Sequence, residues 1–327
     1  MPFVARRLLP AVFALVMLAL GASAAGASAT AAATTRTFPI ETLGDRGADV
    51  RAIQGLLTHH GFAVPIDGVF GASTRVAVRA FQAARGLPVD GLVRETTWVK
   101  LVVALAPGST GQAVKVLQRQ LNEKRFAHLA VDGVYGTATR SAVITFQKHM
   151  GMTASGLVGP VTWRTLLWHF DYPAFNAASL CDYSVGNGTA NWATGAAIGH
   201  LEAAAATFAA TGHGRVPVGD NSLEHGGDIA LHETHEVGLD VDVRPVRDAR
   251  NQCSWGTNWR VASYDRAATR ALIKSIRAEA AGHIKVIYFN DPVLIGEGLT
   301  RWFSGHDDHI HVRYCEPYHP LVAYRCG

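Results

Sequence analysis

Histidines and aspartates in the second half of the chain have types and spacings that suit a metal site. His235 precedes Asp242 by seven positions, and His309 and His311 flank a single isoleucine much later in the chain. Two imidazoles and one carboxylate form a common ligand set of catalytic zinc, which keeps a fourth position open for water. Such a site hydrolyses its substrate, and a histidine that is not a ligand can act as general base.

Two β-strands are needed to bring these residues together. Residues 237–243 alternate between apolar and polar types, which predicts a strand whose polar face carries both Asp240 and Asp242. A second strand over 309–314 would project both of its histidines from one face. If the strands are neighbours, one of these histidines joins His235 and Asp242 around a metal and the other is the base. Asp240 shares the face of Asp242 and is an alternative ligand.

Three segments of this half resemble penicillin-insensitive murein endopeptidases. They are 219–227, 235–242 and 305–313, and they have the order, internal spacing and flanks of that family. The family belongs to a zinc peptidase superfamily that includes lysostaphin-type enzymes and D-Ala-D-Ala carboxypeptidases. The resemblance covers roughly the last half of the chain. It departs at Glu236, where the family commonly has glutamine after the first ligand.

The resemblance implies a role for each residue. The ligands of one Zn²⁺ ion would be His235, Asp242 and His311. The catalytic residues would be the base His309, with His232 and His306 close to the site. The implied activity is hydrolysis of the D-Ala to meso-diaminopimelate cross-link of peptidoglycan. The alternatives are a D,D- or L,D-carboxypeptidase that trims stem peptides with the same ligand set, and a non-catalytic wall-binding protein.

An internal duplication precedes the catalytic half. The motif Asp-Gly-Val-aromatic-Gly at 67–71 recurs at 132–136, and a Phe-Gln pair and a tryptophan recur at the same offset of 65. A constant offset over turn and apolar positions indicates a tandem repeat. Each unit of about 60 residues is close to the lower size limit for a core of its own. The units resemble the peptidoglycan-binding domains found beside many wall hydrolases.

Apolar spacing predicts three helices in each repeat, which in the first repeat are 48–59, 74–84 and 96–105. Helix-spaced aromatic residues are core by default, so core packing is favoured over ligand contact for Phe81, Phe146, Trp98 and Trp163.

The catalytic half is predicted to be an α+β domain with a small, mainly antiparallel sheet. Its expected helices are 194–211 and 264–281, the latter with Ser263 as N-cap. Its other expected strands are 216–218 and 285–289. The junction at 170–178 is short, so we expect the second repeat to rest against the catalytic half. The predicted domains are a signal peptide (1–29), repeat 1 (40–105), repeat 2 (106–170) and the zinc peptidase (171–327).

The first 29 residues have the pattern of a secretory signal. Arg6 and Arg7 precede an apolar segment, 8–20, that is short for a membrane span, and small-residue cleavage patterns follow it. A membrane anchor is the alternative. Cleavage would lower the formal net charge of +4 by two, which is too little to suggest nucleic-acid binding. We expect a secreted monomer whose partner is peptidoglycan. It would be extracellular or attached to the wall, or periplasmic in a host with an outer membrane. After cleavage of the signal we expect no further membrane contact.

Four cysteines all lie in the second half, and an even number in an exported protein suggests disulfides. We predict the pairs Cys181–Cys253 and Cys315–Cys326, because the second would hold the C-terminal tail. A cysteine metal site is disfavoured, since no Cys-x2-Cys spacing is present.

Most other histidines have no partner at ligand spacing and are predicted to be ordinary surface or core residues. They are His59, His60, His128, His149, His169, His200, His213 and His319. The sequence leaves His225 and His283 undecided.

Overall fold

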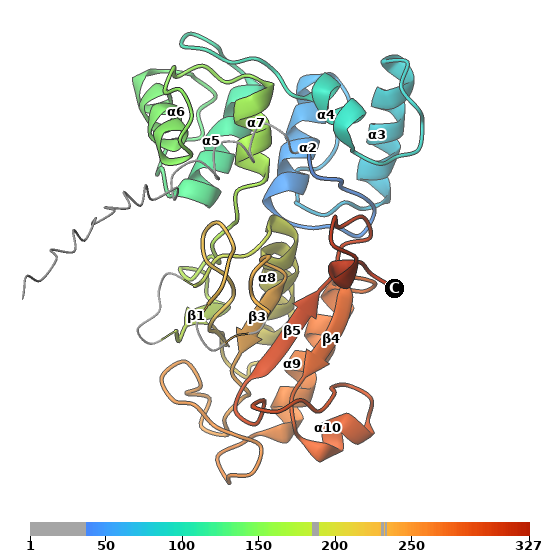
Figure 1. The fold of residues 1–327 in the computed structure, drawn as a ribbon, viewed down its shortest axis with the longest axis vertical. Helices are drawn as coiled ribbons and strands as arrows, with labels where there is room; N and C mark the ends of the chain where they lie inside the picture. Colours follow the sequence, from blue (N-terminus) through green and yellow to red (C-terminus); the bar gives the residue numbers. More distant parts are fainter. Residues whose placement is uncertain (1–36, 185–189, 230–231, 233) are drawn as a thin grey trace, which may run out of the picture.

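The protein combines a helical part with a part built on a β-sheet (Figure 1). This computed structural model describes residues 37–184, 190–229, 232 and 234–327. The predicted α+β class is confirmed. The predicted signal segment lies outside the described residues. Among the residues that are described, no helix is both long enough and apolar enough to cross a bilayer.

Each repeat folds as three helices. Those of the first are α2 (Ala48–His59), α3 (Ala72–Ala84) and α4 (Glu95–Leu101). Those of the second are α5 (Gln112–Arg125), α6 (Thr137–His149) and α7 (Pro160–Leu167). The apolar stripe of α2 faces inward. The bounds of helix α2 agree with the prediction, whereas helix α4 ends earlier than predicted.

A buried glutamine holds each Asp-Gly turn. Gln54 of α2 donates to Asp67 Oδ1 at 2.7 Å and accepts the N–H of Gly68 at 2.9 Å. Gln118 of α5 makes the corresponding bonds in the second repeat. Gly68 has a φ of 75°, which glycine adopts without a steric cost. The recurrence of this motif therefore reflects a turn that the neighbouring helix stabilises by hydrogen bonds.

The two repeats share one hydrophobic core. α2 packs on α5 so closely that a Cβ at Gly55 would come within 2.4 Å of Val116. The predicted core role of the recurring aromatic residues is confirmed, since both tryptophans and both phenylalanines are buried. With a common core, each repeat buries a larger fraction of its surface than such a small unit could bury alone.

The second half contains a five-stranded sheet in the order β1-β2-β3-β5-β4. The strands are β1 (Leu180–Asp182), β2 (Val216–Val218), β3 (Asp240–Val243), β4 (Ile284–Tyr288) and β5 (Ile310–Tyr314). Among the strand pairs of the described residues, only β1–β2 is parallel, so the prediction of a mainly antiparallel sheet is confirmed.

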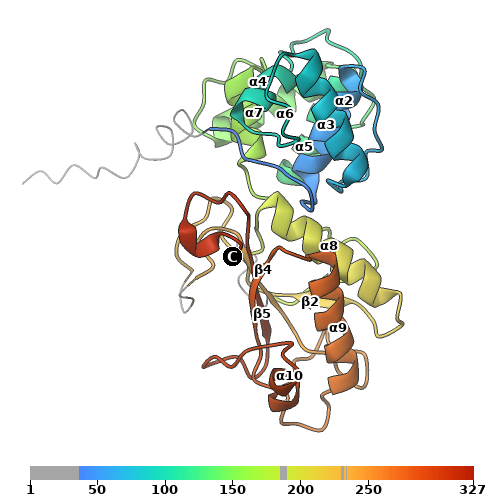
Figure 2. The ribbon, with the colours of Figure 1, turned by 90° about the vertical axis from the view of Figure 1, so that its right-hand side faces the viewer.

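Two helices, α8 (Gly195–Ala209) and α9 (Arg266–Glu279), lie on one side of this sheet (Figure 2). Val241 and Val243 of β3 belong to the core on this side. The predicted N-cap of α9, Ser263, is wrong: Asp265 caps the helix by accepting the N–H of Ala268. A short helix, α10 (Pro292–Gly296), follows β4, and the 3-10 turn η1 (Val322–Tyr324) lies near the C-terminus.

Both predicted disulfides are present. Cys315–Cys326 holds the C-terminal tail against the end of β5. Cys181–Cys253 joins β1 to the long connection between β3 and α9. That connection forms one wall of a pocket beside Asp242, so the disulfide Cys181–Cys253 restrains a pocket wall with little regular structure.

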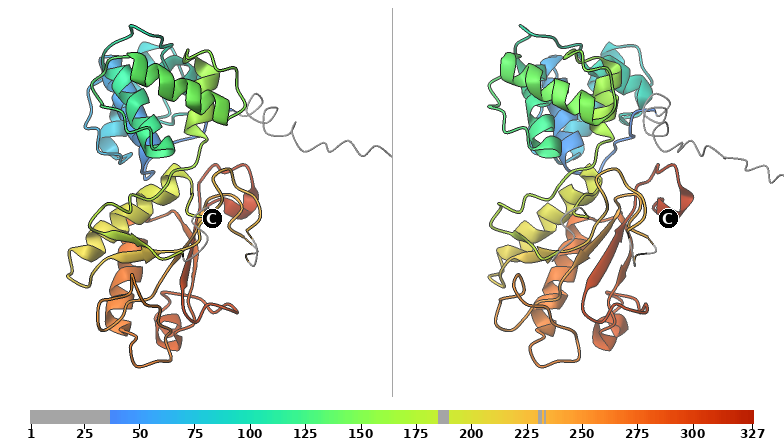
Figure 3. Two further views of the ribbon diagram at one scale, coloured as in Figure 1. Left: turned by 90° about the vertical axis from the view of Figure 1, so that its left-hand side faces the viewer. Right: turned by 60° about the vertical axis from the view of Figure 1, so that its left-hand side comes forward.

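Figure 3 shows the helical repeats resting on the half that contains the sheet. A buried lysine joins these two parts. Lys124 of α5 is fully buried, and its Nζ lies 3.0 Å from Asp49 Oδ1 of α2 and 3.0 Å from Asp171 Oδ1. The same ammonium donates to the carbonyl of His169 at 2.8 Å. Asp171 lies in the segment after α7 and pairs with Ala193 just before α8. The expected contact between the second repeat and the catalytic half is therefore confirmed.

Replacing Lys124 tests this interaction. Lys124→Met should lower the free energy of unfolding by about 3–5 kcal/mol, because it leaves two buried carboxylates without their counter-charge. The matched control is Lys148→Met, which removes an exposed lysine of α6 and should change stability by about 0.5 kcal/mol or less. Denaturant midpoints of the full chain are the measurement. Equal effects of the two substitutions would contradict the role given to Lys124.

Candidate metal centre

The predicted ligands meet where β3 and β5 lie side by side. These strands pair antiparallel with Asp242 directly opposite His311. His235 lies in the segment that leads into β3 and is also buried. The strand alternation that predicted this arrangement holds, because the valines of β3 enter the core and both aspartates contact His311.

The predicted ligand atoms are close to one another. His235 Nε2 lies 3.2 Å from His311 Nδ1 and 3.5 Å from Asp242 Oδ2. His311 Nδ1 lies 3.0 Å from Asp242 Oδ1. Tetrahedral zinc with bonds of 2.0–2.1 Å separates its ligand atoms by about 3.3–3.4 Å. The three side chains are thus spaced for such an ion without large rearrangement.

Hydrogen bonds fix the orientation of both rings. His235 Nδ1 donates to the backbone carbonyl of Asn221, which turns Nε2 toward Asp242. His311 Nε2 donates to Asp240 Oδ1 at 2.9 Å, which turns Nδ1 to the same point. Metal-binding histidines generally use the second nitrogen in this way. Asp240, the alternative ligand, is held by His311 and by Arg313, whose Nε lies 2.6 Å away.

The electrostatics favour a positive charge between His311 and Asp242. Burial acts to lower the pKa of His311, but hydrogen bonds to Asp240 and Asp242 outweigh it and raise that pKa to about 9. Burial acts to raise the pKa of Asp242, and the charges of His235 and His311 instead hold it well below its usual range. A divalent cation would satisfy the same carboxylates.

His232 is a further candidate ligand. The ligand atoms of His232, His235 and Asp242 all lie within 4.8 Å of one another. His232 Nδ1 is 3.9 Å from Asp242 Oδ2, and its Nε2 bonds Asp220 Oδ2 at 3.2 Å. That hydrogen bond raises the pKa of His232. These residues form a possible metal site, and His311 reaches the same carboxylate from the other side.

The predicted base, His309, lies next to this cluster. Its Nδ1 bonds Asp308 Oδ1 at 3.0 Å. Burial acts to lower the pKa of His309, but Asp308 and the charge of Asp242 outweigh it and raise that pKa. The ring of His306 lies near it in a tilted arrangement, with ring centroids 4.7 Å apart. The structure therefore brings all six predicted site residues into one region.

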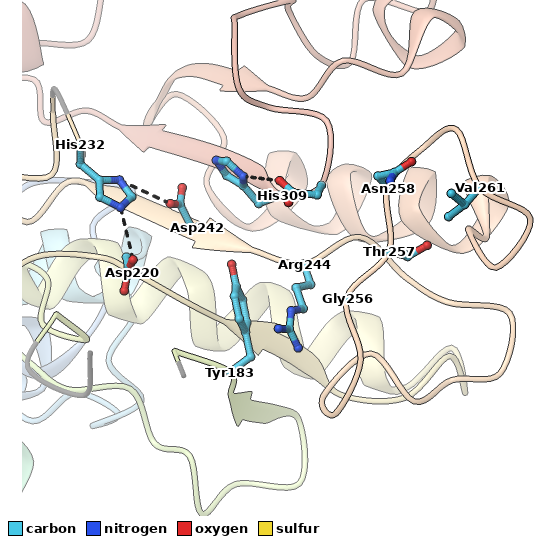
Figure 4. Close-up of a pocket in the computed structure, with 11 residues that line it drawn as sticks. Tyr183, Asp220, His232, Asp242, Arg244, Gly256, Thr257, Asn258, Val261 and His309 are labelled. Atoms are coloured by element: carbon cyan, nitrogen blue, oxygen red, sulfur yellow. Dashed lines mark hydrogen bonds and ion pairs between the residues drawn. The ribbon is translucent and has the colours of Figure 1, made fainter. Parts of the chain in front are cut away.

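A cavity of about 500 Å³ opens beside the ligands (Figure 4). His232, Asp242 and His309 line one side of it, and the connection between β3 and α9 supplies the opposite wall with Gly256, Thr257, Asn258 and Val261.

Sequence analysis missed two side chains of this cavity, Tyr183 and Arg244. The Arg244 guanidinium lies 4.1 Å above the Tyr183 ring, and both face the cavity. Tyr183 is also close to Gly219, where a Cβ would come within 2.4 Å of its hydroxyl. Each is a single residue without a spacing pattern, although Arg244 follows β3 directly, at the end of the strand that carries Asp242.

A family model described as "Putative peptidoglycan binding domain" matches residues 46–101 and 110–166. These two matches coincide with the two helical repeats and identify them as tandem domains of this kind.

Wall-active proteins are among the similar sequences. The chain is 35% identical over 147 residues to N-acetylmuramoyl-L-alanine amidase CwlM of Mycobacterium tuberculosis, covering 38% of this chain and 36% of the relative. It is 34% identical over 99 residues to the zinc D-Ala-D-Ala carboxypeptidase of Streptomyces albus G, covering 30% and 38%. The chain thus spans well under half the length of these relatives.

Among solved structures, a peptidoglycan-binding protein from Clostridioides difficile is 41% identical over 19% of this chain and 40% of its own, with a TM-score of 0.19. A phage endolysin from Burkholderia is 31% identical over 33% of this chain and 38% of its own, with a TM-score of 0.20. The repeats are thus peptidoglycan-binding domains, and the similar sequences include an amidase and a zinc carboxypeptidase.

Asp240→Asn tests whether Asp240 orients His311. Removing its charge should weaken zinc binding about 10–100-fold, which is typical for a carboxylate that holds a metal-binding histidine. Competition with a chromophoric chelator measures the affinity, and Asp248→Asn, at an exposed position, is the control. An unchanged zinc affinity in a folded Asp240→Asn chain would show that Asp240 does not act through His311.

Proposed function

We propose that this protein is a zinc metallopeptidase that hydrolyses peptide cross-links of peptidoglycan, as a murein DD-endopeptidase does. The observation that carries the proposal is the convergence of His235, Asp242 and His311, beside His309, at the edge of an open cavity. The same chain carries two peptidoglycan-binding domains, so its substrate is expected in the wall. These domains and the two disulfides indicate an extracytoplasmic location.

Zinc would be held by Nε2 of His235, a carboxylate oxygen of Asp242 and Nδ1 of His311. When bound, it polarises a substrate carbonyl and lowers the pKa of a water molecule toward neutrality. Asn221 and Asp240 hold the two rings in the tautomers that this coordination requires. The donor set fits the metal, because it combines two neutral imidazoles with one carboxylate at tetrahedral spacing.

His309 is proposed as the general base. Its Nδ1–H donates to Asp308, which leaves Nε2 free to accept a proton from the attacking water and return it to the leaving amine. Asp308 stabilises the imidazolium that forms between these two transfers. His232 and His306 border the same region, and His232, held by Asp220, can donate to developing negative charge on the substrate.

The cavity side chains suit a peptide with free carboxylates. Arg244 offers guanidinium donors that match a carboxylate, and Thr257 and Asn258 add neutral polar groups on the facing wall. The stem peptides of peptidoglycan carry such carboxylates. Arg244 also supports a second candidate, a carboxypeptidase that trims stem peptides, because it could bind a C-terminal carboxylate.

Digestion of purified sacculi separates these functions. An endopeptidase releases uncross-linked muropeptides, a carboxypeptidase releases single amino acids, and a non-catalytic wall-binding protein releases neither. Mass spectrometry of the soluble products identifies the bond. Products that persist in excess chelator would exclude the proposed zinc chemistry.

Two substitutions separate the proposed ligand from the proposed base. His311→Ala should lose both zinc and activity. His309→Ala should keep most of its zinc and lose about 10²–10⁴-fold in rate, which is the usual contribution of general acid–base catalysis. Elemental analysis and muropeptide turnover are the measurements, with exposed His128→Ala as control. Loss of zinc from His309→Ala and its retention by His311→Ala would reverse the assignment.

A further inference from the structure

A second histidine cluster lies between the second repeat and the catalytic half. It contains His149, His169, Glu224 and His225, whose potential ligand atoms all lie within 4.8 Å of one another. The sequence places no ligand partner at metal spacing from His149 or His169, and the fold brings Glu224 and His225 beside them. Their partners are more than 50 positions away in the chain, on a loop whose location only the tertiary fold determines.

From this geometry we propose that the four side chains form a second, structural zinc site that joins the second repeat to the catalytic half. Its ligands come from three segments: the last residue of α6, the segment after α7 and the loop between β2 and β3. Three histidines and one glutamate supply four nitrogen and oxygen ligands that zinc accepts, and four-coordinate geometry is typical of structural zinc.

Three of the distances within the cluster are close to those of tetrahedral coordination. His149 Nε2 lies 3.2 Å from His225 Nε2 and 3.1 Å from Glu224 Oε1. His169 Nε2 lies 3.2 Å from Glu224 Oε1, and His225 Nε2 lies 3.9 Å from Glu224 Oε2. Ligand atoms around tetrahedral zinc are about 3.3–3.4 Å apart, so small side-chain adjustments suffice.

His169 has the features of a metal-binding ring. Its side chain is fully buried, and Nδ1 donates to the carbonyl of Phe170 at 2.7 Å. This fixes the lone pair of Nε2 toward Glu224, and within the described part of the chain that nitrogen has no hydrogen-bond partner. A buried nitrogen without a partner costs free energy, which a metal ion would recover. His235 is held by a backbone carbonyl in the same way.

The surroundings of the cluster suit a structural site. Arg125 pairs with Glu224, as expected for a metal-binding carboxylate that is held by a further hydrogen bond. The side chain of His225 is half exposed, which gives an ion a path from solvent. The turn after His225 lies against the backbone of Glu236, next to His235. An ion here would hold the loop that also carries Asn221, the partner of His235.

Zinc stoichiometry of the full chain tests this site without reference to activity. After equilibrium dialysis against Zn²⁺, elemental analysis should find two ions in the unchanged chain and one in the variant His149→Ala/His225→Ala. The variant His235→Ala/His311→Ala should also hold one ion, and the chain with all four substitutions should hold none. The control His59→Ala/His128→Ala removes two exposed histidines outside both clusters and should hold two.

Co²⁺ provides a spectroscopic measurement of the same site. The His235→Ala/His311→Ala chain loaded with Co²⁺ should show the intense visible absorption of tetrahedral coordination, and adding His149→Ala/His225→Ala should abolish it. Equal zinc content in the unchanged chain and in His149→Ala/His225→Ala would overturn the proposal. This comparison tests the proposal even if the His235→Ala/His311→Ala chain does not fold.

Discussion

The buried ammonium of Lys124 constrains the arrangement of the whole molecule. Taking an ion out of water costs several kcal/mol, and here two carboxylates and a backbone carbonyl must all be in place to offset that cost. Asp49 belongs to the first repeat, Lys124 to the second and Asp171 to the catalytic half. Both carboxylates also lie against Gly195, the first residue of α8, whose missing side chain leaves room for them. The N-terminus of α8 stabilises their negative charge. An alternative packing of any one segment would leave a buried charge unpaired.

This constraint changes how the repeats relate to the catalytic site. A wall anchor on a flexible linker would affect only the local substrate concentration, whereas the repeats here pack directly on the catalytic half. At Gly47 a Cβ would overlap the backbone of Gly195, so α8 contacts the first repeat at backbone distance. The loop between β2 and β3 lies against the second repeat at Glu224 and holds His235 through Asn221. The position of a ligand thus depends on packing between the two halves.

Much of this architecture could be predicted from local pattern. Alternation identified β3, a constant offset identified the repeats, and the spacing of two motifs selected six residues that the fold brings together. Lys124 could not be identified, because a lysine in the last turn of an amphipathic helix normally faces solvent. His149 and Glu224 likewise carry no local signal, since their proximity arises only from the packing of distant segments. Tyr183 and Arg244 are single residues whose common location depends on sheet order.

Strand register explains why the two aspartates of β3 have different surroundings. Alternation places Asp240 and Asp242 on the same face, and sequence alone could not choose between them. In the sheet, Asp240 lies opposite Arg313 and Asp242 lies opposite His311. Arg313 and His311 Nε2 both bond one oxygen of Asp240, so its charge is already compensated. Asp242 instead faces imidazole nitrogens of His235 and His311, whose other nitrogens are fixed by hydrogen bonds. A two-residue shift of register would place Asp240 opposite His311 and Asp242 opposite His309, so the observed pairing of β3 with β5 supports Asp242 as the proposed ligand.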